Sequence, residues 1–192
     1  MEADFSIELG REDAVLEVPW TSAHGTPAYF DLKRRPELLR EVEEAQRTVE
    51  LAGFLAEVNS PASLLETAKC DVWSTNELQL EDAIFDARWK FGSYVDLLLP
   101  AAGARFSLEL HQSFAHRLRE DLRRFPEFPA AAEFVVRRCY YHAQGETRDG
   151  FCLTFYLFGY GDDEGEARRQ WARALKLVEA ILVKTVESEG FV

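Results

Sequence analysis

The first thirty residues of the chain alternate between apolar and polar positions. An apolar residue stands at every second position from 3 to 9, and this period of two is typical of a half-buried β-strand. The same period over 16–20 predicts a second strand after a polar turn at 10–13. Pro19 has no N–H to donate, so the second strand should lie at the edge of a sheet or end there. We expect a third short strand over 29–32.

The next stretch changes to the spacing of a helix. Pro36 suits the first helical position, where a missing N–H costs nothing. Asn59-Ser60-Pro61 should end the helix, because the residue before a proline is pushed out of the α region. Glutamates occupy most of the side of this helix that lies opposite its apolar stripe. The apolar stripe, at spacings of four and three, consists of Leu38, Val42, Ala45, Val49, Ala52 and Ala56.

The middle of the chain returns to strand-like alternation, over 68–72 and again over 83–91. Gly92-Ser93 follows, with β-forming residues on both sides, and glycine at the first loop position is typical of a type II′ hairpin turn. A two-residue loop there places Trp89 opposite Asp96. We therefore predict a hairpin centred on Gly92-Ser93.

Two further helices are expected in the second half of the chain. Residues 107–124 fit a strand at their start, but the helical stripe is longer and Ser107 is a suitable N-cap, so we predict a helix. The C-terminal stretch has the clearest helical pattern, with Asp163 and Glu166 spaced as a capping box. Gly190 is placed to end this helix. Its stripe is Ala167, Trp171, Ala174, Val178, Ile181 and Thr185, widened by Leu175 and Leu182.

An aromatic-rich hairpin is expected between these helices, from 134–143 and 151–160. Its turn is either Asp149-Gly150 or a four-residue loop over 146–149. Both faces of this hairpin are apolar, whereas an antiparallel sheet usually turns one polar face to water. One face should pack on helices, and the other needs a cover from this chain, a second subunit or a ligand. That second face carries Cys139, Tyr141, Cys152, Tyr156, Phe158 and Tyr160, with Arg137 and Thr154.

The order of elements predicts the fold class. Grouped antiparallel strands with intervening helices indicate an α+β protein, here an antiparallel sheet of several hairpins with about three amphipathic helices packed mainly on one face. No linker-like stretch divides the chain, so we expect residues 1–192 to form a single domain.

The charge balance excludes one class of partner. The chain has 34 acidic and 22 basic residues, a net charge of −12, which argues against direct nucleic-acid binding because phosphates need a clustered basic surface. The simplest interpretation of the acidic stretch 37–57 is a solvated helix, and the alternatives are a docking surface for a basic partner or a nucleic-acid mimic. The basic stretch 117–124 could meet the acidic helix of another subunit.

The location of the protein is also predicted from the sequence. No apolar run approaches 18 residues, so no membrane span is expected, and the acidic start differs from a signal peptide. Three cysteines fit a reducing cytoplasm better than a disulfide framework. We predict a cytoplasmic protein.

The usual catalytic and metal-binding motifs are absent. The four histidines, His24, His111, His116 and His142, lack the spacing of metal ligands, and the chain has no phosphate-binding loop and no nucleophile elbow. We expect no metal and no cofactor, a partly buried, hydrogen-bonded core position for His111 rather than the role of a catalytic base, and structural roles for Cys70, Cys139 and Cys152.

Asp96 is the residue of greatest interest, because it interrupts an apolar run and a buried carboxylate needs a partner. A structural hydrogen bond is one interpretation, and an acid or base with a raised pKa lining a cavity is the other. We predict a non-enzymatic, self-associating binding or interaction protein. A small enzyme with Asp96 and a histidine is the alternative. The candidate pocket or interface residues are Trp89, Asp96, Tyr141, Tyr156, Phe158 and Tyr160.

Overall fold

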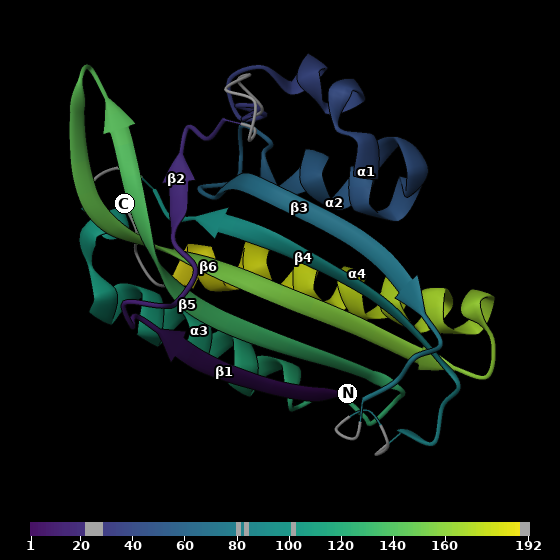
Figure 1. The fold of residues 1–192 in the computed structure, drawn as a ribbon. Helices are drawn as coiled ribbons and strands as arrows, with labels where there is room; N and C mark the ends of the chain where they lie inside the picture. Colours follow the sequence, from purple (N-terminus) through teal and green to yellow (C-terminus); the bar gives the residue numbers. More distant parts are fainter. Residues whose placement is uncertain (22–28, 80–81, 83–84, 101–102, 189–192) are drawn as a thin grey trace.

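The computed structural model describes residues 1–21, 29–79, 82, 85–100 and 103–188, with the side chains of the last helix described as far as Leu182. Its sheet follows the order β1-β5-β6-β4-β3, and β2 also pairs with β5 (Figure 1). The strands are β1 Glu2–Glu8, β2 Leu16–Val18, β3 Glu66–Thr75, β4 Trp89–Leu98, β5 Ala130–Ala143 and β6 Glu146–Gly161. The α-helices are α1 Glu43–Arg47, α2 Val49–Val58, α3 Leu108–Leu122 and α4 Glu164–Ser188.

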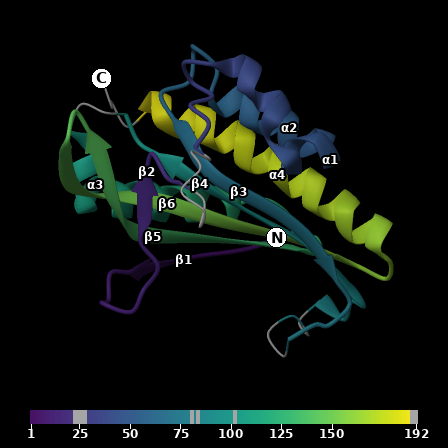
Figure 2. The ribbon, with the colours of Figure 1, turned by 45° about the horizontal axis from the view of Figure 1, so that its top comes forward.

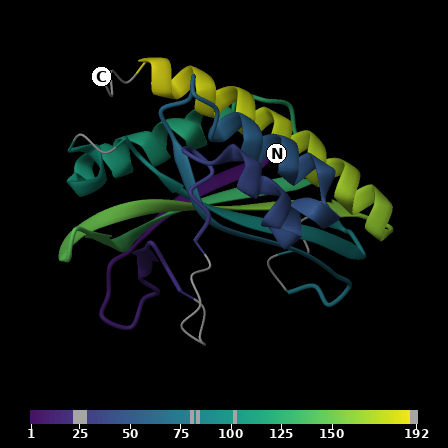
Figure 3. The ribbon, with the colours of Figure 1, turned by 90° about the horizontal axis from the view of Figure 1, so that it is seen from above.

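The helices lie on one face of the sheet, and the connection between β1 and β2 lies on the side of the other face (Figure 3). This arrangement confirms the α+β prediction. The sheet is mixed, because β1 and β2 both run parallel to β5. The two N-terminal strands therefore follow one another along the same edge, and β2 ends before Pro19 as predicted. Residues 29–32 are not a strand, which corrects that prediction.

The predicted hairpin at Gly92-Ser93 is wrong. Both residues lie inside β4, which pairs with β3 on one side and β6 on the other. The glycine is required by packing, because a Cβ at Gly92 would lie 2.7 Å from Cε2 of Trp73. Trp89 and Asp96 are seven positions apart on one strand and point to opposite faces, so the predicted pairing between them does not exist.

The turn of the last hairpin also differs from the prediction. It consists of Gln144 and Gly145, with φ of 53° and 84°, and Ala143 pairs with Glu146. Positive φ at both positions is the signature of a type I′ turn. The side chains nevertheless lie on the predicted faces of the hairpin, because the predicted and observed registers differ by an even number of residues and only an odd shift moves a side chain to the other face.

The predicted helix after Pro36 is broken into three pieces. A 3₁₀ helix, Pro36–Glu41, is followed by α1 and α2, with extended backbone at Val42 (φ −80°, ψ 108°) and Thr48 (φ −136°, ψ 93°). The break rotates the buried side of α2 away from the predicted stripe, so that Val49 is 74% exposed. The residues of α2 that face the core are Leu51, Phe54, Leu55 and Val58.

The other two helices agree with the sequence pattern. Ser107 caps α3 by accepting a hydrogen bond from the Leu110 N–H at 3.2 Å. Asp163 caps α4 by accepting one from the Glu166 N–H at 2.7 Å. Gly190 lies outside the described residues. The stripe of α4, as far as its side chains are described, packs in one continuous core between helices and sheet with Phe54, Phe114, Phe134 and Phe155.

Candidate functional site

The face of the sheet away from the helices is covered at one end by the chain itself. Tyr160 lies there, 4% exposed, and its hydroxyl donates to Asp82 Oδ1 at 2.7 Å. Its ring stacks on Phe85 at 4.3 Å between centroids. Lys90 Nζ lies 2.7 Å from Asp82 Oδ2 and neutralises this carboxylate. Tyr160 therefore belongs to an internal structural contact.

The opposite end of the same face is covered by β2. Leu16 and Val18 form a second, smaller apolar cluster with Leu98, Cys139, Tyr141 and Cys152. Tyr141 is 7% exposed, and its hydroxyl donates to the carbonyl of Phe151 at 2.7 Å. Tyr141 is thus also a structural residue.

A hollow of about 250 Å³ remains between the two covered ends. Asp96 lies in it, 6% exposed, and accepts a short hydrogen bond from the Thr154 hydroxyl on the paired position of β6. Burial raises the pKa of the Asp96 carboxyl, while the Thr154 hydrogen bond and the charges of Arg137 and Lys69 oppose this rise. The lining of this Asp96 hollow is Ala14, Val15, Leu16, Lys69, Tyr94, Asp96, Arg137, Thr154 and Tyr156.

Aromatic rings continue from the Asp96 hollow across the sheet. Tyr94 contacts Tyr156 at 5.9 Å between centroids, Tyr156 stacks with Phe158 at 6.4 Å, and Phe158 meets Trp73 at 6.2 Å. All four are half-buried. We call these four residues the aromatic strip. Burial raises the pKa of Tyr94 to about 12, helped by the nearby acid Asp96, so its hydroxyl stays protonated at neutral pH.

Two cations border the hollow. Arg137 donates to the Tyr156 hydroxyl at 3.0 Å and lies 2.7 Å from Glu8, which balances its charge. Lys69 comes from β3, beside a bulge between Thr67 and Cys70. Its Nζ lies 4.6 Å from the centroid of the Trp20 ring.

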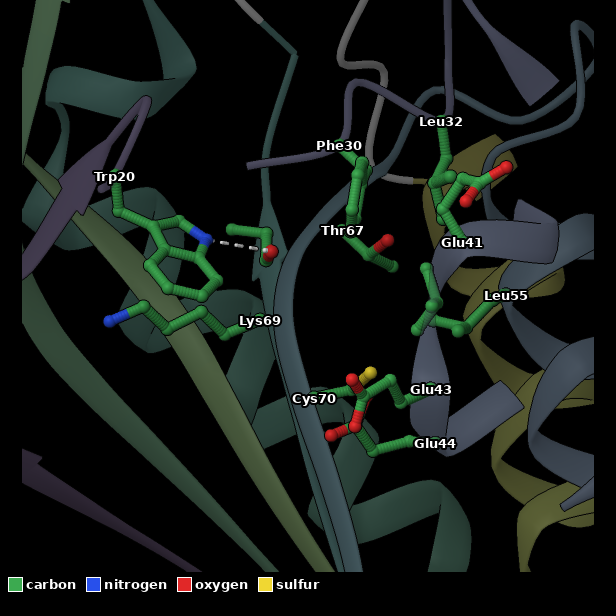
Figure 4. A pocket seen from close by; sticks show the side chains of 12 residues that line it. Trp20, Phe30, Leu32, Glu41, Glu43, Glu44, Leu55, Thr67, Lys69 and Cys70 are labelled. Atoms are coloured by element: carbon green, nitrogen blue, oxygen red, sulfur yellow. Dashed lines mark hydrogen bonds between the residues drawn. The ribbon is translucent and has the colours of Figure 1, made fainter. Parts of the chain in front are cut away.

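A second opening, the β3 groove, begins on the other side of Lys69. It has a volume of about 320 Å³ and lies between β3 and the α1–α2 segment (Figure 4). Apolar side chains form its floor, and glutamates of the 3₁₀ helix and α1 line its rim. The lining residues are Trp20, Phe30, Leu32, Glu41, Val42, Glu43, Glu44, Leu55, Thr67, Ala68, Lys69 and Cys70.

The structure brings together only part of the predicted site. Asp96 and Tyr156 share the hollow, and Phe158 adjoins it. Trp89 packs half-buried against the main core on the other face, because it lies seven positions from Asp96 on the same strand. The prediction missed Tyr94 and Lys69. The alternation around Asp96 places Tyr94 on the same face, but nothing in the sequence marks the bulge that turns Lys69 toward it.

The described histidines lie away from the hollow. His111 is fully buried on α3, with Nδ1 2.8 Å from the Ser107 carbonyl, and burial lowers the pKa of its imidazole. His116 contacts Phe5, and His142 contacts Thr147. His24 lies outside the described residues. Within the described part of the chain, Asp96 therefore has no histidine partner, and no group of three His, Cys, Asp or Glu residues is arranged to hold a metal ion.

The cysteines are free thiols that pack among other side chains. Cys139 and Cys152 are buried, and Cys70 is half-buried at the groove. Burial, followed by the nearby acids Glu44 and Asp71, raises the pKa of the Cys70 thiol to about 12. The reactive thiolate is therefore scarce at neutral pH.

Comparisons of the chain with models of protein families, with curated proteins and with solved structures found no match. Among the described residues, no helix has the length and apolar character needed to cross a membrane.

Proposed function

We propose that this protein is a binding protein that holds a small polar ligand in the Asp96 hollow. The observation that carries this proposal is the position of Asp96. Its carboxyl group is almost fully withdrawn from water and faces the hollow, and within the described structure its hydrogen-bond partner is a hydroxyl rather than a cation. Burying a carboxyl group in this way lowers the stability of the folded protein. Groups buried at such a cost are typical of functional sites.

The charges around the hollow indicate the class of ligand. Glu8 already balances Arg137, so Lys69 is the cation best placed for an anionic group on a ligand. Asp96 can accept a hydrogen bond from a donor at the other end of the ligand, with the rings of Tyr94 and Tyr156 beside it. We therefore propose a small molecule with both an anionic group and a hydrogen-bond donor, such as an amino acid or a hydroxy acid.

Thermal unfolding in the presence of amino acids and hydroxy acids tests this proposal. A ligand at one hundred times its Kd stabilises the folded state by about 2.7 kcal/mol, which corresponds to a rise in Tm of about 5–10 °C for a chain of this size. At least one compound should raise the Tm of the wild type and not of Asp96→Asn. Asp71→Asn is the matched control, since Asp71 is an exposed carboxylate outside the hollow. No stabilisation by any compound, or equal stabilisation of Asp96→Asn, contradicts the proposal.

The aromatic strip supports a second proposal, self-association through the same face. Four half-buried rings in a row present apolar surface that a second copy would cover, and two-fold symmetry is the commonest way to do so. Tyr160 and Tyr141 take no part, because the chain itself covers them. Light scattering of the wild type and of Phe158→Glu tests this proposal.

We also propose that the protein works in the cytoplasm. The support is that Cys70, Cys139 and Cys152 are all unpaired, as expected in a reducing compartment.

A further inference from the structure

The outer edge of β3 is free of a strand partner among the described residues, because β3 ends the strand order of the sheet. Figure 2 shows β3 as the outermost strand on the side where α1 and α2 lie. The N–H of Val72 donates to the Asp71 carboxylate at 2.7 Å, which marks it as directed away from β4. Outward-facing backbone groups alternate along an edge strand, so those of Cys70 and Ser74 face the same way as Val72.

The β3 groove lies at this same edge. The side chain of Cys70 forms part of its lining, opposite the helical segment that carries Glu43 and Glu44 (Figure 4). Trp20 closes one end, where its Nε1 donates to the Ala68 carbonyl at 3.4 Å. The chain thus already places one hydrogen-bond donor on the β3 edge. Beyond Trp20, the edge continues through Cys70 to Ser74.

The rim of the groove is acidic. Arg40 lies 3.0 Å from Glu41, and Arg47 lies 3.8 Å from Glu44, whereas no cation of the described residues lies within ion-pair distance of Glu43. Together with the net charge of −12, this rim attracts positive groups and repels polyanions such as nucleic acids.

We propose that the β3 edge binds an extended segment of another protein. The segment adds a strand beside Cys70–Ser74 and places a lysine or arginine side chain in the groove, against Glu43 and Glu44. Backbone hydrogen bonds to the edge supply affinity, and the acidic groove selects the side chain, which is the division of roles found when a peptide extends a sheet. This site is separate from the Asp96 hollow, although Lys69 borders both.

Selection of peptides from a random displayed library on the wild-type protein tests this proposal. The selected peptides should share a lysine or arginine flanked by β-branched residues. A synthetic copy of a selected peptide should bind Glu43→Gln/Glu44→Gln at least tenfold more weakly than the wild type. N-methylation of alternate backbone amides of that peptide should also weaken binding at least tenfold, because the methyl groups block pairing with the strand edge.

Two control variants distinguish peptide binding at the β3 groove from nonspecific attraction to negative charge and from binding in the Asp96 hollow. Glu57→Gln/Glu109→Gln removes two exposed carboxylates elsewhere and should leave peptide affinity within twofold of the wild type. Asp96→Asn should leave it unchanged as well, so failure of the proposed ligand site does not affect this test. A library that yields no binding peptide, or peptides that bind the groove variant as well as the wild type, would overturn the proposal.

Discussion

Trp171 is the side chain whose removal should damage the fold most, because it is entirely buried between α4 and the sheet. Its ring lies 4.9 Å from that of Phe91, and its Nε1 donates to Ser93 Oγ at 2.8 Å. Burying a tryptophan removes about 150–250 Å² from water, worth about 4–6 kcal/mol at about 25 cal/mol per Å². Trp171→Ala should therefore cost about 5 kcal/mol, a large part of the stability of a typical domain.

Urea unfolding followed by circular dichroism measures this effect. The hydrogen bond is isolated by Ser93→Ala and Trp171→Phe, each of which leaves one partner unpaired at a cost of about 1–3 kcal/mol. The double variant should lose less free energy of unfolding than the two single variants together, because the second substitution removes a group that is already unpaired. A cost below about 1 kcal/mol for Trp171→Ala would refute the packing of α4 on the sheet.

Three further predictions concern the site and its surroundings. Because burial raises the pKa of Asp96 in the folded state, the contribution of Asp96 to stability should fall as pH rises above 3.8, and urea unfolding at a series of pH values should show the stability of the wild type falling relative to that of Asp96→Asn. Light scattering should give a dimer for the wild type and the 22.0 kDa monomer for Phe158→Glu; a wild-type monomer at all micromolar concentrations would end the self-association proposal. A thiol reagent should label Cys70, Cys139 and Cys152 slowly in the native protein and fully only after denaturation, and fast labelling of the native protein would contradict their structural role.

The elements that could be predicted from sequence are those set by local signals. The α4 helix follows from its apolar stripe and from the Asp163 cap, and β1 follows from strict alternation. The assignment of side chains to the two apolar faces of the β5–β6 hairpin was also correct, since it depends only on whether the predicted register differs from the observed one by an even or an odd number of residues. The turn itself was not, because Gln144-Gly145 and Asp149-Gly150 both satisfy the requirements for positive φ.

The errors arise where contacts distant in sequence determine the structure. Gly92 resembles a turn residue locally, but its lack of a side chain makes room for Trp73 of the neighbouring strand. The breaks at Val42 and Thr48 have no local breaker residue, and both side chains are buried by packing. The hollow could be predicted only in part, through Asp96 and through Tyr156 on the second face of the last hairpin, because its walls come from five separate strands and from the segment before β2.

Ligand binding at Asp96 is tested most directly by a ¹H–¹⁵N NMR titration of the full chain with the amino acid or hydroxy acid that stabilises it most. We expect the largest chemical-shift changes at the backbone amides of Tyr94, Asp96, Thr154 and Tyr156, and we expect Asp96→Asn to abolish them. Chemical-shift changes confined to residues outside the Asp96 hollow would contradict the proposal that the ligand binds there.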